Sequence, residues 1–261
     1  MKKTIWSIEI LPQNVSEVGF IPDLIKEVYI TMIPGTGFNE TILAAKKIQA
    51  SSKQAIPHLT ARTFSGLEEL RTCLSGLQAS GIERILLIGG GVSKPAGIFS
   101  SVMDMLITEL FAEYGIKSID FAGHPEGNPD DPDSDYHLLE KLHWTDKRKI
   151  PTRIVTQWSL NAEKTNNWID RLRKNGVQNP INLGIPGPST LKTMLRFAKV
   201  CGVNASTQVL RKQGFNISKL MFVNKPDKIV SELRGYDQLH LYPFGGVAKS
   251  SDWLIEWKKK F

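Results

Sequence analysis

The fold is decided by the stretch Arg84-Ile85-Leu86-Leu87-Ile88-Gly89-Gly90-Gly91. Four consecutive aliphatic residues lack the polar alternation of a half-exposed strand, and such a run is typical of a parallel strand covered on both faces. Three glycines then end the strand. Before it, Leu67, Leu70, Leu74 and Leu77 recur at the spacing of an amphipathic helix. The stretch therefore predicts a helix followed by a buried parallel strand, which is the repeating unit of an α/β fold.

The same unit recurs along the whole chain. Strands are predicted over residues 5–11, 26–32, 55–59, 84–88, 117–122, 150–156, 180–185 and 238–242. Helices are predicted over residues 39–51, 67–80, 99–114, 136–147, 162–174, 191–199, 204–220 and 227–234. Eight strands that alternate with helices need parallel pairing through helical crossovers, and closing them gives a (β/α)8 TIM barrel. We therefore predict that residues 1–261 form a single barrel domain.

An open doubly wound sheet is the main alternative to the barrel. That fold places a glycine-rich turn directly after its first strand. The first predicted strand here is followed by Pro12-Gln13-Asn14 instead. The closed barrel is therefore favoured, and its active site is expected at the carboxyl ends of the strands.

Composition and charge indicate a globular protein with anionic ligands. The 261 residues are 41% hydrophobic and 23% charged, and the net charge is +7. A positive balance favours phosphates or polycarboxylates, and nucleic acid has to be considered. The basic runs Lys147-Arg148-Lys149 and Lys258-Lys259-Lys260 carry no nucleic-acid motif, so they are expected to be solvated surface. No nucleic-acid partner is predicted.

The cysteines and the apolar runs predict a cytoplasmic protein. Cys73 and Cys201 are far apart in the chain, so reduced thiols are expected. Glu9 interrupts the apolar N-terminal run too early for a signal peptide. No stretch approaches the roughly 18 apolar residues of a transmembrane helix, so no membrane span is predicted.

Polar residues and glycines collect at the predicted carboxyl ends of the strands. Each one alone could be a strand-end polar group or a turn glycine. Together they predict an active site at the barrel mouth, lined by one acid, two histidines, one amide and a bare backbone loop that a flat or phosphorylated ligand can approach. These strand-end residues are Glu9, Thr31, His58, Gly89, Gly90, Gly91, His124, Gln157, Pro186 and Tyr242.

The sequence lacks the motifs of nucleotide-binding proteins, serine hydrolases and common metal sites. The three glycines match neither nucleotide-binding pattern, and no GxSxG of a serine hydrolase is present. The acidic run over residues 130–135 lacks the glycine and the terminal glutamate of an EF-hand. The five histidines show no zinc spacing, so no metal is predicted.

Four segments in this order resemble the methylenetetrahydrofolate reductase family, and the resemblance covers about residues 5–245. It implies a (β/α)8 flavoprotein that binds FAD at the barrel mouth. It also implies an oxidoreductase of one-carbon metabolism, acting on CH–NH groups, that interconverts 5,10-methylenetetrahydrofolate and 5-methyltetrahydrofolate. The segments are Ser7-Ile8-Glu9-Ile10-Leu11-Pro12, Pro57-His58-Leu59-Thr60, Gly123-His124-Pro125-Glu126-Gly127-Asn128-Pro129 and Thr156-Gln157.

The resemblance also implies the roles of the residues. Glu9 would be the catalytic acid that opens the folate imidazolidine ring, and Gln157 would bind the pterin. A carboxylate in an apolar strand is expected to have the raised pKa that a general acid needs. The residues that would line FAD are Thr31, His58, Gly89, Gly90, Gly91, Ala122, His124 and Asn128.

Several positions depart from the family pattern. The family's Arg-Gly-Asp is Gly89-Gly90-Gly91 here, and the second histidine of the signature is Asn128. Lys141, Lys147 and Arg148 are the candidates for the FAD phosphates. The electron donor or acceptor stays open, because no nicotinamide-side pattern is found, and so does the oligomeric state. The alternative is a folate-binding barrel without redox activity that serves a methyl-transfer or demethylation pathway.

Overall fold

Eight parallel strands close the barrel in a computed structural model that describes residues 5–32, 35, 37–200 and 223–260. Their order around the barrel is β1-β10-β7-β6-β5-β4-β3-β2, and every neighbouring pair is parallel. The predicted (β/α)8 TIM barrel is confirmed. The strands are β1 Ile5–Ile10, β2 Ile25–Ile30, β3 Gln54–Thr60, β4 Arg84–Ile88, β5 Ser118–Gly123, β6 Ile154–Thr156, β7 Ile181–Pro186 and β10 Gln238–Tyr242.

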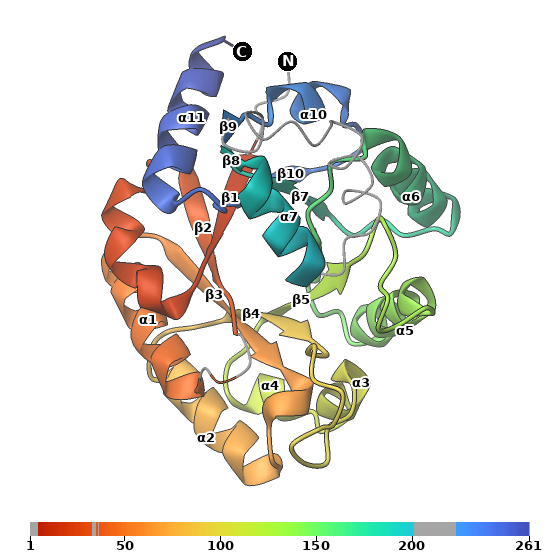
Figure 1. Cartoon of the computed structure of the whole chain (residues 1–261). Helices are drawn as coiled ribbons and strands as arrows, with labels where there is room; N and C mark the ends of the chain where they lie inside the picture. The colour runs from red at the N-terminus through yellow and green to blue at the C-terminus, as the bar shows by residue number, and fades with distance from the viewer. Residues whose placement is uncertain (1–4, 33–34, 36, 201–222, 261) are drawn as a thin grey trace.

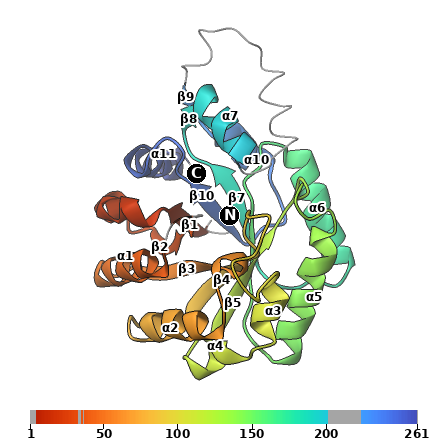
Figure 2. The ribbon, with the colours of Figure 1, turned by 60° about the horizontal axis from the view of Figure 1, so that its bottom comes forward.

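Helices surround the strands, as Figures 1 and 2 show. A large apolar core fills the space between the sheet and this outer layer, with residues such as Ile8, Val28 and Leu87 fully buried. The longer helices are α1 Phe38–Ala50, α2 Leu67–Gln78, α5 Ser134–Lys147, α6 Ala162–Lys174, α7 Leu191–Val200 and α11 Val247–Lys260.

The crossovers differ from the prediction in places. The prediction of a single helix over residues 99–114 is wrong, because this segment forms two short helices, α3 Val102–Leu106 and α4 Leu110–Glu113. They are separated at Glu109, whose φ of 57° is left-handed and ends helical geometry. The Glu109 carboxylate accepts a hydrogen bond of 2.6 Å from Arg148 Nη2.

Some elements were not predicted, and one prediction cannot be compared. The 3-10 helices η1 Pro12–Phe20 and η2 Ala61–Thr63, the two-stranded sheet of β8 Ser189–Thr190 and β9 Val223–Asn224, and α11 were not predicted. The helix α10 Asp227–Glu232 is shorter than its predicted range. The helix predicted over residues 204–220 lies outside the described residues.

The inside of the barrel is layered along its axis. At the amino ends of the strands, Arg84 binds both Asp120 and Glu27, with N–O distances of 2.6 and 2.8 Å. Arg153 and Gln238 also bind Glu27, and we call these five residues the charged floor. Above them an apolar layer holds Tyr29, Ile56, Leu86 and Val155. The carboxyl ends of the strands lie above this layer.

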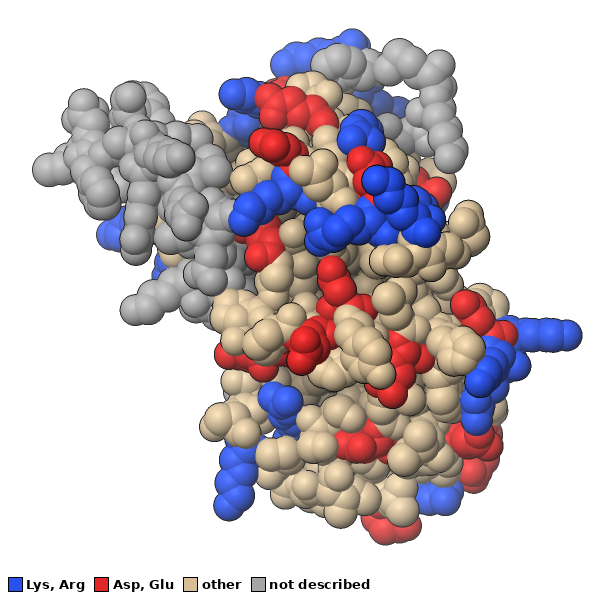
Figure 3. Space-filling view, turned by 90° about the vertical axis from the view of Figure 1, so that its right-hand side faces the viewer, with Lys and Arg blue, Asp and Glu red and all other residues tan. Residues whose placement is uncertain are grey.

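The charges on the surface are interspersed. Figure 3 shows the face that carries α5 and α6, where basic and acidic side chains intermingle. On this face Arg171 pairs with Asp135, Arg173 with Asp237, and Arg234 with Asp170. Within the part of the chain that the structure describes, no helix is both long and apolar enough to cross a bilayer.

Candidate active site

A cavity of about 1040 Å³ opens at the carboxyl ends of the barrel strands. Its volume lies just above the roughly 300–1,000 Å³ that is usual for ligand pockets. The cavity therefore has room for a large ligand or for two smaller ones. The ten residues whose roles the family resemblance implies all line it, and of the other predicted strand-end residues Tyr242 lines it and Pro186 does not. The ten are Glu9, Thr31, His58, Gly89, Gly90, Gly91, Ala122, His124, Asn128 and Gln157.

Glu9 lies at the centre of a polar cluster contributed by four strands. Thr31 Oγ1 donates a hydrogen bond of 2.7 Å to Glu9 Oε1. The other carboxylate oxygen, Oε2, is 3.4 Å from His240 Nε2 and 3.5 Å from His58 Nε2. Inward-facing positions alternate along each strand, so closure of the barrel brings these side chains together.

The electrostatics of this cluster correct one prediction. Burial raises the pKa of Glu9, but the imidazoles of His58 and His240 and the Thr31 hydroxyl outweigh it, so the net shift is downward. The raised pKa predicted for Glu9 is therefore wrong for the ligand-free site. Burial has the opposite effect on His58 and lowers the pKa of its imidazole. Its Nε2 is buried without a hydrogen bond in the described structure.

The glycine loop after β4 leaves its backbone open to the cavity. A Cβ at Gly89 or Gly91 would meet no atom within 4 Å. Gly90 has a φ of +98°, and a Cβ there would lie 2.3 Å from Thr60 Cγ2, so only glycine fits. Arg62, which the sequence did not single out, holds the loop by donating to the carbonyl oxygens of Gly90 and Val92.

The segment after β5 brings His124 beside Lys141 of α5. Burial lowers the pKa of His124 to about 4, and the nearby ammonium of Lys141 adds to the shift. Burial also lowers the pKa of Lys141, which forms no ion pair with any described residue. Its Nζ lies 5.7 Å from the centre of the Phe121 ring. Glu126 accepts a hydrogen bond of 2.6 Å from Ser159 Oγ, so it braces the segment.

The unfolding free energy is expected to fall as the pH is lowered from about 6.5 to about 4. The pKa of His124 drops from 6.5 to about 4 on folding, so the unfolded chain binds the extra proton in this window. Urea unfolding at pH 7 and pH 5 measures the loss, and His124→Asn should reduce it. His143→Asn, on an exposed part of the same α5 helix, is the control. Equal pH dependence in all three proteins would contradict this role of His124.

A group of aromatic side chains that we call the aromatic wall also lines the cavity, and it was not predicted. The rings of Phe197 and Phe244 stack with centroids 4.1 Å apart, and Trp158 meets Phe244 edge-on. Phe197, Tyr242 and Phe244 line the cavity. Trp158, Tyr242 and Phe244 lie at or just after strand ends, but nothing in the sequence indicated that Phe197 of α7 would stack on Phe244.

The candidate phosphate ligands do not lie together. Lys141 lines the cavity, whereas Lys147 and Arg148 do not. The Arg148 guanidinium lies 4.0 Å from the centre of the Trp144 ring and pairs with Glu109. Of the three candidates, only Lys141 can reach a ligand in the cavity.

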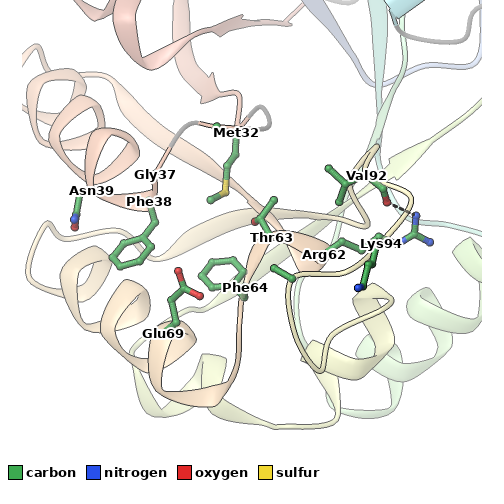
Figure 4. Close-up of a pocket in the computed structure, with 12 residues that line it drawn as sticks. Met32, Gly37, Phe38, Asn39, Arg62, Thr63, Phe64, Glu69, Val92 and Lys94 are labelled. Atoms are coloured by element: carbon green, nitrogen blue, oxygen red, sulfur yellow. Dashed lines mark hydrogen bonds between the residues drawn. The ribbon is translucent and has the colours of Figure 1, made fainter.

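A second cavity of about 460 Å³ lies between the loops that follow β2, β3 and β4 (Figure 4). It is walled by Met32, Phe38 and Phe64, and Arg62 separates it from the larger one. Its Glu69 carboxylate already accepts hydrogen bonds from Ser65. The larger cavity, which is lined by Glu9, His58 and His124, is therefore the candidate active site.

The comparisons with known proteins agree with this geometry. The family model described as methylenetetrahydrofolate reductase matches residues 24–217. The chain belongs to the methylenetetrahydrofolate reductase family. Methylenetetrahydrofolate reductase (NADH) 1 of Arabidopsis thaliana is 28% identical over 163 residues, which are 57% of this chain and 27% of that protein. The match thus spans about a quarter of the length of that relative.

Solved structures share the fold of this methylenetetrahydrofolate reductase family member. A Clostridium thermocellum protein that binds two copies of 5-methyl-5,6,7,8-tetrahydrofolic acid superposes with a TM-score of 0.64 at 12% identity, covering 99% of this chain and 96% of that one. Dihydropteroate synthase of Thermus thermophilus gives a TM-score of 0.53 at 10% identity, covering 100% and 95%. At these identities the likeness shows the barrel fold.

One departure from the methylenetetrahydrofolate reductase pattern now has a structural setting. Gly91 stands at the position of the acid in the family's Arg-Gly-Asp, and the space beside its Cα is open. A larger side chain would fit there without a clash. The loss of the acid is therefore a change in the chemistry of the cavity, and packing does not require it.

Proposed function

We propose that this chain is a cytoplasmic, FAD-dependent oxidoreductase that interconverts 5,10-methylenetetrahydrofolate and 5-methyltetrahydrofolate. The observation that carries the proposal is the position of Glu9, a carboxylate held by one hydroxyl and two imidazoles at the base of a large cavity. Family membership supports the reaction class. The methyltetrahydrofolate bound by the Clostridium thermocellum barrel supports the substrate class.

The described residues fit FAD in three respects. The cavity is large, and the bare backbone of Gly89 and Gly91 leaves open space for a flat ring system. His58 Nε2 is a buried polar atom without a hydrogen bond in the described structure, and the polar atom it faces is Glu9 Oε2 at 3.5 Å. Lys141 is a partly buried cation that forms no ion pair with the residues described, and a phosphate would provide its counter-charge.

The residues of the chain have separate tasks in the proposed reaction. FAD, when bound, supplies the hydride chemistry. Glu9 gives a proton to the leaving nitrogen as the imidazolidine ring opens, and takes it back in the reverse direction. The Gln157 amide binds the pterin, and the aromatic wall of Phe197 and Phe244 covers its apolar part.

One absorbance spectrum of the purified protein, before and after addition of FAD, tests the cofactor. Flavin bands that bleach on addition of 5-methyltetrahydrofolate are expected. A protein that takes up no FAD and shows no bleaching would contradict the proposal. Tight folate binding by a colourless protein would instead support the alternative of a non-redox folate-binding barrel, which the glycine at position 91 in place of the family's acid favours.

Lys141→Met is expected to weaken FAD binding by about 10- to 100-fold, because a charge-assisted hydrogen bond is worth about 1.5–3 kcal/mol. Fluorescence titration with FAD measures the affinity. Lys147→Met is the matched control, since Lys147 is on the same α5 helix but outside the cavity. Equal FAD affinities of the two variants would show that Lys141 does not bind the phosphates.

A further inference from the structure

His240 is a fully buried histidine that the sequence did not single out. It is on β10, and its ring binds side chains at both nitrogens. Its Nδ1 is 2.9 Å from Ser7 Oγ, and its Nε2 is 3.4 Å from Glu9 Oε2. Ser7, His240 and Glu9 therefore form a chain of three polar side chains that ends at the cavity.

The hydroxyl of Ser7 can serve His240 in either charge state. After Nε2 has given its proton to Glu9, Nδ1–H still donates to the Ser7 hydroxyl oxygen, and the bare Nε2 accepts a hydrogen bond from the Glu9 carboxyl group. When the imidazole is protonated, Nδ1–H donates to the same hydroxyl oxygen. His240 can therefore gain or lose a proton without leaving a buried nitrogen unpaired.

The other polar groups around His240 have hydrogen-bond partners elsewhere or do not bond to Glu9. Tyr29 of β2 meets the ring edge-on at 4.8 Å, but its hydroxyl donates to Asp120 in the charged floor. Tyr242 lies 4.9 Å away, and its hydroxyl donates to the Thr156 carbonyl. β7 presents Gly184, which has no side chain. His58 of β3 faces the same carboxylate, but burial lowers its pKa and its Nε2 has no hydrogen bond to any described residue.

We propose that His240 is the positioning residue that supplies Glu9 with its proton: the proton rests on the His240 imidazole and moves from Nε2 to Glu9 Oε2 when a ligand covers the carboxylate. The inference rests on the proposed function. In the open cavity, Glu9 is ionised beside the imidazolium. A ligand that displaces water disfavours this pair of charges, so the proton transfers and both groups become neutral.

The proton balance of the step is simple. The bond between N10 and the methylene carbon breaks, and its electron pair stays on N10. N10 takes the proton from Glu9, and the methylene carbon stays on N5 as an iminium cation. Glu9 is then a carboxylate beside neutral His240, and a proton from water restores the imidazolium once the cavity reopens.

The first test uses the ligand-free protein. Nitrogen-15 NMR of the imidazoles should show His240 as the imidazolium in the ligand-free wild type. In Glu9→Gln, where the charge partner is gone, the imidazolium fraction should fall at least about threefold. Neutral His240 in the wild type, or an unchanged fraction in Glu9→Gln, would overturn the proposal whether or not the protein turns over folate.

The second test uses the pH profile of turnover. His240→Asn should lower kcat at neutral pH by about tenfold and move the alkaline limb about one pH unit lower, while KM stays within about threefold. Ser7→Ala retains the imidazole and should shift the limb in the same direction by less, which keeps the test decisive if His240→Asn does not fold. If the alkaline limb of the pH profile of kcat is unchanged in both folded variants, the inference is overturned. If the wild type neither binds nor turns over folate, the proposed function itself is overturned.

Discussion

Glu9→Gln is expected to lower turnover by about 10²–10⁴-fold while the fold and ligand binding stay nearly intact. The amide keeps the size of the side chain and can still accept the hydrogen bond that Thr31 donates to Oε1. It cannot carry the proton that the ring-opening step needs. Steady-state turnover with 5-methyltetrahydrofolate and an artificial electron acceptor measures the loss.

The controls for this variant separate chemistry from stability. Glu83→Gln changes an exposed carboxylate that pairs with Lys117, and its turnover should equal that of the wild type. Thermal unfolding of Glu9→Gln should stay close to the wild-type value. If Glu9→Gln turned over at the wild-type rate, Glu9 would be a structural carboxylate and the proposed mechanism would fail.

Arg84→Met is expected to lower the free energy of unfolding by about 3–5 kcal/mol. Arg84 is almost fully buried in the charged floor, where its Nη2 is 2.6 Å from Asp120 and its Nη1 is 2.8 Å from Glu27. Removing the guanidinium leaves two carboxylates in a low-dielectric interior without their main counter-charge. Urea unfolding at neutral pH measures the change.

A surface arginine provides the matched control. Arg71 pairs with Glu113 at 3.3 Å, but both side chains are well exposed, so Arg71→Met should leave the free energy of unfolding nearly unchanged. Adding Asp120→Leu to Arg84→Met should recover part of the loss, because one uncompensated charge is then removed. A cost for Arg84→Met as small as that for Arg71→Met would show that the floor does not stabilise the barrel.

The sequence predicted the strands and the site because both depend on local patterns. The aliphatic run of β4 identifies a covered strand by itself, and the predicted site residues lie near the carboxyl ends of strands or in the loops that follow them. The break at Glu109 could not be predicted, because residues 99–114 contain neither the glycine nor the proline that usually marks a helix break. The charged floor was missed for a different reason, since Arg153 and Glu27 are 126 residues apart.

The chemistry of Glu9 shows the same limit. Its burial could be inferred from the apolar residues beside it, and burial alone would raise its pKa. His58 and His240 reach Glu9 only because the barrel closes, and they reverse the direction of the shift. His240 left one signal in the sequence: it is two residues before Tyr242, on the same inward-facing side of β10.

The layers inside the barrel bear on how this protein can change over evolution. The charged floor, which we expect to stabilise the barrel, is separated from the mouth by the layer of Tyr29, Ile56, Leu86 and Val155. Substitutions at open mouth positions such as Gly91 should therefore alter reactivity at little cost in folding free energy. Such a scaffold tolerates drift in its catalytic residues, and new activities can arise in the mouth before the fold is at risk.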